Sequence, residues 1–150
     1  MKLQISYYPS DDILLLDNGK QWKDGGNIAE NVVVYSDSES KPAAIEVSGA
    51  AKLLRPILNA GQLKAAPRDC RASGDRPDED NLDRVNLALT VSYDREVDIL
   101  TLECGLPAPF QYTIADGLTA FYDGEDEYGK FINAVRLENA AELLKPYLRP

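Results

Sequence analysis

The amino-acid sequence contains an internal repeat, and this repeat constrains the fold more than any other feature. Residues 6–16 return as residues 92–102, with six of eleven positions identical at an offset of 86. Residues 49–58 return as residues 139–148, with six of ten positions identical at an offset of 90. The second copy therefore has four extra residues, between positions 123 and 134. A module has been duplicated within one chain.

The repeat divides the chain into three parts. Residues 1–58 form the first repeat, residues 59–88 a polar linker and residues 89–150 the second repeat. The linker is rich in charged residues, Gly and Pro, a composition that predicts mobility. A unit of about 60 residues is near the lower limit for folding alone, so we expect the two repeats to share one core.

Composition indicates a globular protein and argues against several kinds of chemistry. The chain is 44% apolar and 27% charged, as in ordinary soluble domains. It has no histidine, which removes Ser-His-Asp and Cys-His catalytic groups and most zinc sites. Cys70 and Cys104 lie in unlike settings and are expected to be reduced thiols. No glycine motif for phosphate binding is present, and we expect neither a metal nor a cofactor.

The charge is negative and unevenly distributed. The net charge is −9, with −2 on residues 1–58 and −6 on residues 89–150. No basic stripe could neutralise phosphates, which disfavours nucleic-acid binding. An acidic surface fits a basic protein partner or serves only to keep the protein soluble. We predict no secretion signal and no membrane contact, and hence a cytoplasmic protein.

Short segments in which apolar and polar residues alternate predict β-strands. In the first repeat the predicted strands cover residues 3–7, 13–16, 31–35 and 43–47, and matching segments recur in the second repeat. An antiparallel meander of about four strands per repeat is the simplest topology for this series.

Each repeat ends in a short helix that is expected to cover one face of the sheet. Ala140, Leu143, Leu144 and Tyr147 share one side of the second helix. Asn139 is predicted to be its N-cap, with Glu142 reaching back to the cap N–H group. The expected fold is α+β, with two repeats of a β-meander and a short helix packed with pseudo-two-fold symmetry, as in a covalent homodimer.

Carboxylates occupy the turn after the first strand of each repeat. Asp12, Asp94 and Asp98 are predicted to be structural, accepting hydrogen bonds from the backbone N–H groups of their own turns. The alternative is an enzyme in which Asp12 and Asp98 act on a small-molecule substrate. That alternative predicts a cleft lined by those side chains, with raised pKa values.

The segments that differ most between the repeats are the candidates for partner binding. Trp22 and Phe110 are the large apolar residues of these segments, and each is also a candidate lid on the core. Glu125, Asp126 and Glu127 belong to an acidic loop that is longer in the second repeat than its counterpart, residues 36–41, in the first. These five residues are the predicted contacts with a protein partner.

The same loop has carboxylates at alternate positions, as calcium-binding loops do. Tyr128 stands where such a loop has Gly, and Ala134 stands where it has a bidentate Glu. Calcium binding by residues 123–127 is therefore the alternative to a solvated loop, and we predict no metal site.

A turn of the form Tyr-Asp-x-x-x-Asp-x-Leu is followed, after a long hairpin, by a strand that runs into Asn-Ala-x-x-Leu. In the second repeat the residues are Tyr93, Asp94, Asp98, Leu100, Val135, Leu137, Asn139, Ala140 and Leu143. This order resembles the small bacterial domains of unknown function called DUF2283. The first repeat matches it with Tyr7, Asp12 and Leu14 and departs from it at Tyr8 and Gly49. The family has no established activity to carry over, and the small size and gene company of some members imply an antitoxin-like role.

The sequence thus favours a non-enzymatic, acidic protein-binding or regulatory module. A carboxylate-dependent enzyme is the alternative. The duplication predicts either a monomer with pseudo-dimeric repeats or a weak homodimer.

Overall fold

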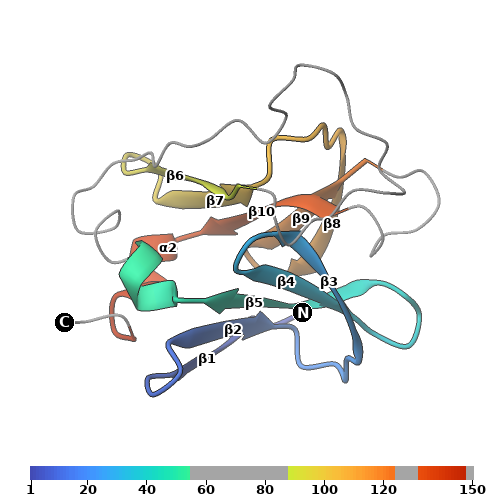
Figure 1. The fold of residues 1–150 in the computed structure, drawn as a ribbon, viewed down its shortest axis with the longest axis horizontal. Coiled ribbons are helices and arrows are strands. Elements are labelled where there is room, and N and C mark those ends of the chain that lie inside the picture. The colour runs from blue at the N-terminus through green and yellow to red at the C-terminus, as the bar shows by residue number, and fades with distance from the viewer. Residues whose placement is uncertain (55–87, 124–131, 148–150) are drawn as a thin grey trace.

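The computed structural model describes residues 1–54, 88–123 and 132–147. These residues form two five-stranded antiparallel sheets, one from each repeat, with few helical residues (Figure 1). The fold is strand-rich and mixed, which agrees in outline with the predicted α+β class. The predicted linker, residues 59–88, lies almost entirely outside the described residues.

The two sheets have the same strand order. The first contains β1 (Gln4–Tyr8), β2 (Ile13–Asp17), β3 (Asp24–Ala29), β4 (Val32–Ser36) and β5 (Pro42–Ser48), in the order β1-β2-β5-β4-β3. The second contains β6 (Thr90–Asp94), β7 (Ile99–Glu103), β8 (Phe110–Ala115), β9 (Leu118–Tyr122) and β10 (Ile132–Glu138), in the order β6-β7-β10-β9-β8. Helical residues 50–54 follow β5, and helix α2 (Ala140–Leu144) follows β10.

The prediction of a four-stranded meander was wrong, because each sheet has a fifth strand and a different topology. The missed strands are β3, whose sequence lacks a clear alternation of apolar and polar residues, and β8, whose alternation Phe-Gln-Tyr-Thr-Ile was overlooked. β2 pairs with β5 and not with β3, so the chain crosses one end of the sheet before the β3-β4-β5 hairpins return it to β2. Strands β2 to β5 therefore form a Greek key, as do β7 to β10.

Backbone geometry repeats along with the sequence. The first four strands of the two sheets correspond at an offset of 86, and β5 corresponds to β10 at an offset of 90. Residues with left-handed φ angles correspond as well: Asp12 with Asp98, Gly19 with Gly105, Asn31 with Gly117, and Gly49 with Asn139. This conformation favours Gly, Asn and Asp, which explains the residue types at these positions.

A single apolar core lies between the inner faces of the two sheets. Buried residues of both repeats belong to one continuous cluster. Side chains from β2, β5, β7 and β10 meet around a cavity of only about 10 Å³, which Leu54 and Leu144 also line. Hydrogen bonds between described residues also join the repeats: Asn18 Nδ2 donates to the Ile114 carbonyl at 3.1 Å, and the Asp116 N–H donates to the Met1 carbonyl at 2.8 Å.

Asn139 stands at the N-cap position of α2, as predicted, but its side chain does not cap the helix. Its backbone is left-handed, with φ 59 and ψ 35, and its side chain makes no capping hydrogen bond. Gly49 has the same conformation in the first repeat, with φ 67. The position selects a residue that tolerates a left-handed backbone, and another residue supplies the cap.

We predict that Asn139→Ala lowers the free energy of unfolding by about 1 kcal/mol, because a Cβ-bearing residue without a short polar side chain is strained in this conformation. Asn139→Gly should leave the stability within about 0.5 kcal/mol of the original protein, because Gly adopts this backbone without strain. Urea denaturation of both variants measures the difference. Equal losses in the two variants would show that the Asn side chain matters more than the backbone.

Candidate functional site

Asp98 caps helix α2 from the preceding hairpin. Its Oδ1 accepts the N–H of Ala141 at 2.7 Å and the hydroxyl of Tyr93 at 2.6 Å. Its Oδ2 accepts the N–H of Glu142 at 3.4 Å, and its carbonyl accepts the N–H of Ala140 at 3.0 Å. The aspartate thereby satisfies donors of the first helical turn, which have no partners within the helix.

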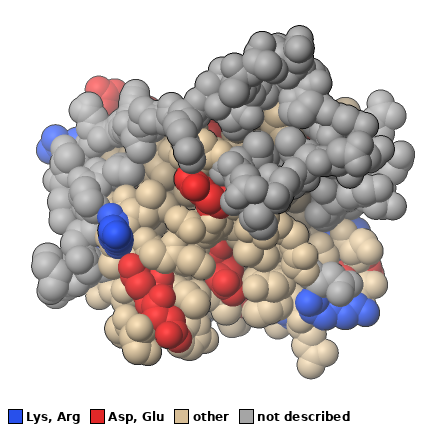
Figure 2. Space-filling view, viewed as in Figure 1, with Lys and Arg blue, Asp and Glu red and all other residues tan. Residues whose placement is uncertain are grey.

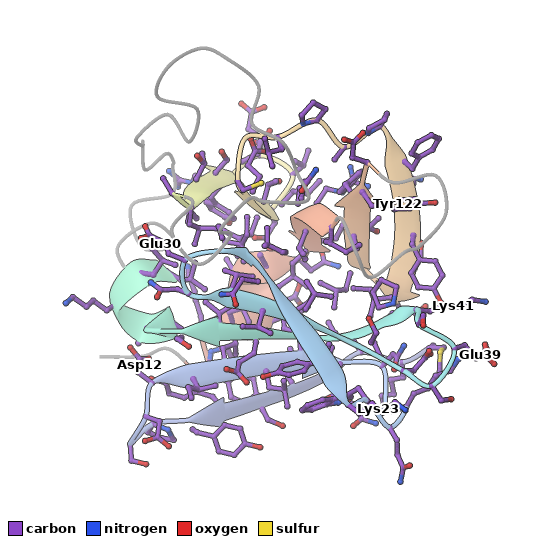
Figure 3. All side chains as sticks on the ribbon, turned by 45° about the vertical axis from the view of Figure 1, so that its right-hand side comes forward. Asp12, Lys23, Glu30, Glu39, Lys41 and Tyr122 are labelled. Atoms are coloured by element: carbon purple, nitrogen blue, oxygen red, sulfur yellow. The ribbon has the colours of Figure 1, made fainter. Side chains whose placement is uncertain are left out.

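Asp12 makes the same contacts in the first repeat. Its Oδ1 accepts the N–H of Ala51 at 2.7 Å and the hydroxyl of Tyr7 at 2.6 Å, and its Oδ2 accepts the N–H of Lys52 at 3.4 Å. Figure 3 shows Asp12 at the tip of the β1–β2 hairpin, beside the helical residues. The predicted partners of Asp12 and Asp98 were N–H groups of their own turns, whereas the bonds described here come from the helix that follows.

Asp94 does act within its own turn, where its Oδ1 accepts the N–H of Glu96 at 3.0 Å. All three aspartates thus accept hydrogen bonds from backbone N–H groups. The donor of Asp94 lies in its own turn, whereas the donors of Asp98 and Asp12 lie in the helical residues.

The electrostatics of the Asp98 carboxylate match this structural role. Burial by itself raises the pKa of Asp98, but hydrogen bonds from Tyr93 and from the N–H groups of Ala141 and Glu142 outweigh burial and hold the pKa below its usual value. Burial and the bond to Asp98 together raise the pKa of Tyr93 to about 12. The enzymatic interpretation required a raised carboxylate pKa, and the direction found for Asp98 is the opposite.

We predict that Asp98→Ala lowers the free energy of unfolding by about 2 kcal/mol, because it leaves helix N–H groups and the Tyr93 hydroxyl without an acceptor. The loss should be largest at neutral pH. In the unfolded chain the pKa has its usual value near 3.8, so the stabilisation is complete above pH 3.8 and disappears as the pH falls through the lower folded value.

Urea denaturation at a series of pH values measures this loss. Glu96→Ala is the matched control, because it removes an exposed carboxylate of the same turn. A loss that stays constant down to acidic pH would contradict the role given to the ionised carboxylate.

The second sheet carries a pocket of about 360 Å³ on its outer face. We call it the outer pocket. Strands β7, β9 and β10 form its floor and the β7–β8 loop forms one wall. The lining residues are Thr101, Glu103, Gly105, Leu106, Ala108, Phe121, Ala134 and Arg136.

In the first repeat, a tryptophan side chain fills the space that corresponds to the outer pocket of the second repeat. Ala108 corresponds to Trp22 and Phe121 to Tyr35, both at the offset of 86. The rings of Trp22 and Tyr35 lie 4.4 Å apart between centroids. Trp22 therefore covers the ring equivalent to Phe121, whereas Ala108 is too small to do so. The smaller side chain of Ala108 leaves space for the pocket.

A buried asparagine supports the loop that forms the wall of the outer pocket. Asn133 is fully buried, and its Nδ2 donates to the carbonyl of Pro107 at 2.7 Å. Its Oδ1 accepts a weak bond from the Cys104 Sγ–H at 3.8 Å. The first repeat has Ala43 at the position of Asn133 and cannot make this contact. The loop conformation is thus specific to the second repeat.

Arg136 is the cation of the outer pocket. Its guanidinium carbon lies 5.2 Å from the centroid of the Phe121 ring, within the range of a cation–π contact. Its Nε is buried and has no hydrogen-bond acceptor among the described residues. A buried donor without a partner costs about 1–3 kcal/mol, so a ligand that supplied an acceptor would recover that energy. Glu103 contributes a carboxylate to the same pocket.

The predicted partner contacts are not brought together into one site. Trp22 is half-buried against Tyr35, as a lid residue would be. Phe110 is 43% exposed on edge strand β8 and stacks on Tyr122 at 5.4 Å. Figure 3 shows Tyr122 on β9, far from Asp12 in this view. Glu125, Asp126 and Glu127 lie outside the described residues, as does nearly all of the candidate calcium loop, residues 123–127.

Sequence reasoning missed Arg136 and the outer pocket. Aligning the repeats by their offsets would have shown that Glu46 in the first repeat is replaced by Arg136, a reversal of charge. The same alignment places Ala108 opposite Trp22. Each signal is visible only when the two copies are compared position by position.

Comparisons with protein-family models, with curated proteins and with solved structures found no match to this chain. Within the described ranges, no three or more Cys, Asp or Glu side chains are grouped so as to hold a metal ion. The helices described in this structure are too short to cross a membrane.

We predict that Trp22→Ala lowers the free energy of unfolding by about 2 kcal/mol, because it removes a half-buried ring that covers Tyr35. Phe110→Ala is the matched control, since it removes a more exposed ring of the second repeat and should cost less than 1 kcal/mol. Thermal or urea denaturation of both variants gives the comparison. Equal losses would contradict the assignment of Trp22 as a lid.

Proposed function

We propose that the protein is a non-enzymatic binding module with a regulatory role, in which the two repeats have divided their tasks. The first repeat is structural, and the second binds a ligand in the outer pocket. One observation carries this proposal: the pocket lies where the first repeat is filled by Trp22. The two copies have the same strand order, and the copy with the small side chain has room for a ligand.

A carboxylate-dependent enzyme has less support. Asp12 and Asp98 are each committed to a helix cap, and neither lines the outer pocket. Binding requires only the shape and polar groups that the pocket has.

The proposal also includes the symmetry that relates the two repeats. We take the two repeats to be related by an approximate two-fold axis, so that the chain corresponds to a covalent homodimer. The reciprocal contacts of β3 with β10 and of β8 with β5 support this relation. The resemblance to DUF2283 fits such an arrangement, because a single-copy relative would need a second chain to cover the inner face of its sheet.

A second candidate function is binding of a protein partner, with or without an antitoxin-like role. The exposed Phe110 on edge strand β8 favours it, since aromatic residues are common at the centre of protein interfaces. The charge of −6 on the second repeat would favour a basic partner. On the face shown in Figure 2, the acidic side chains of the described residues form separate groups between uncharged residues.

We predict that Ala108→Trp closes the outer pocket, because the new indole can lie over Phe121 as Trp22 lies over Tyr35. A screen of small aromatic compounds by ligand-observed NMR should find compounds that bind the original protein and the control variant Phe110→Ala, but not Ala108→Trp. Thermal denaturation checks that Ala108→Trp is folded. Absence of any compound with this pattern would contradict the assignment of the pocket as a binding site.

A further inference from the structure

We infer that the outer pocket recognises a zwitterionic aromatic compound, of the class of the free aromatic α-amino acids. This inference rests on the proposed function and adds the chemical class of the ligand. It is drawn from three features of the pocket: its shape, its two opposite charges, and the residues that stand at the same positions in the first repeat.

The shape of the pocket suits a planar aromatic ring. The corresponding place in the first repeat is taken by the indole of Trp22, which lies 4.4 Å from the Tyr35 ring. In the second repeat the pocket offers the Phe121 ring and the guanidinium of Arg136, two surfaces on which aromatic rings stack. Leu106 and Ala108 supply apolar wall. A ligand ring in this space would contact Phe121 as the Trp22 ring contacts Tyr35 in the first repeat.

The polar groups of the pocket suit a ligand with one positive and one negative charge. Arg136 lies opposite Thr101 in the sheet and Glu103 lies opposite Ala134, so the two charged residues occupy successive rows on the same outer face. They form no ion pair with each other or with any other described residue. A ligand carboxylate can bind the Arg136 guanidinium, including its buried Nε–H, and a ligand ammonium group can bind the Glu103 carboxylate.

The first repeat has a different pair of charges at these positions. This difference supports a specific role for the two charged residues of the second repeat. The positions of Glu103 and Arg136 are taken there by Asp17 and Glu46, which are both acidic. Glu46 accepts a hydrogen bond from the Tyr35 hydroxyl at 2.9 Å, and Asp17 accepts the Gly19 N–H at 2.8 Å. The first repeat therefore uses these groups for its own structure. In the second repeat, among the described residues, Glu103 has no salt bridge and Arg136 contacts the Phe121 ring.

Isothermal titration calorimetry with four related probes tests the inference. L-Tryptophan carries the ring and both charges, indole-3-acetate only the carboxylate, tryptamine only the ammonium group, and indole neither. We expect L-tryptophan to bind most tightly, and each single-charge probe to bind about tenfold or more weakly. We also expect Arg136→Gln and Glu103→Gln each to weaken L-tryptophan binding by about tenfold, whereas Arg95→Gln, an exposed Arg outside the pocket, should have no effect.

The outcomes separate this inference from the proposed function. If L-tryptophan fails to bind, or binds no better than indole, the ligand class is wrong. Should other aromatic compounds still bind in a way that Ala108→Trp abolishes, the pocket remains the binding site. Equal binding of L-tryptophan to the original protein and to Ala108→Trp would place the site elsewhere and overturn both.

Discussion

The inner faces of the two sheets must cover each other, and the rest of the structure depends on this constraint. Each sheet has one apolar face, and a repeat of about 60 residues is near the lower limit for burying such a face alone. The shared core contains equivalent residues of the two copies, such as Leu14 with Leu100 and Leu16 with Leu102. Substitutions on the inner faces therefore affect both repeats. The outer faces are free of this constraint, and the copies differ there at the positions of the outer pocket.

The residues that the two copies share are explained by the core and by the helix caps. A helix of about five residues is unstable alone, so its first turn depends on the bonds from the hairpin carboxylate. The identical pair Asp12 and Asp98 accepts those bonds, and the identical pair Tyr7 and Tyr93 donates its hydroxyls to these carboxylates. The residues of the repeated motif thus have mainly structural roles. Residues that bind a ligand are expected at positions where the repeats differ.

The sequence predicted most strands and the apolar helix faces, because these leave a local pattern of polar and apolar residues. It did not predict β3, where Gly25 and Gly26 interrupt the pattern, or the pairing of β2 with β5, which depends on contacts distant in the chain. The Asn139 side chain was expected to cap the helix, because a local pattern cannot show that the distant Asp98 carboxylate already accepts the helix N–H groups. Trp22 was recognised as a large residue in a variable segment. The outer pocket was not, because nothing about Ala108 or Arg136 is unusual until the first repeat is set beside the second.

We propose that the outer face of the second repeat binds a ligand while the same face of the first repeat does not. The most direct test is an NMR titration of the isotope-labelled protein with L-tryptophan, followed through the backbone amide signals. The account predicts shifts at the pocket residues Thr101, Glu103, Phe121, Ala134 and Arg136. It also predicts unchanged signals at their counterparts Leu15, Asp17, Tyr35, Ala44 and Glu46. Equal shifts in both sets, or shifts confined to the edge strand around Phe110, would contradict it.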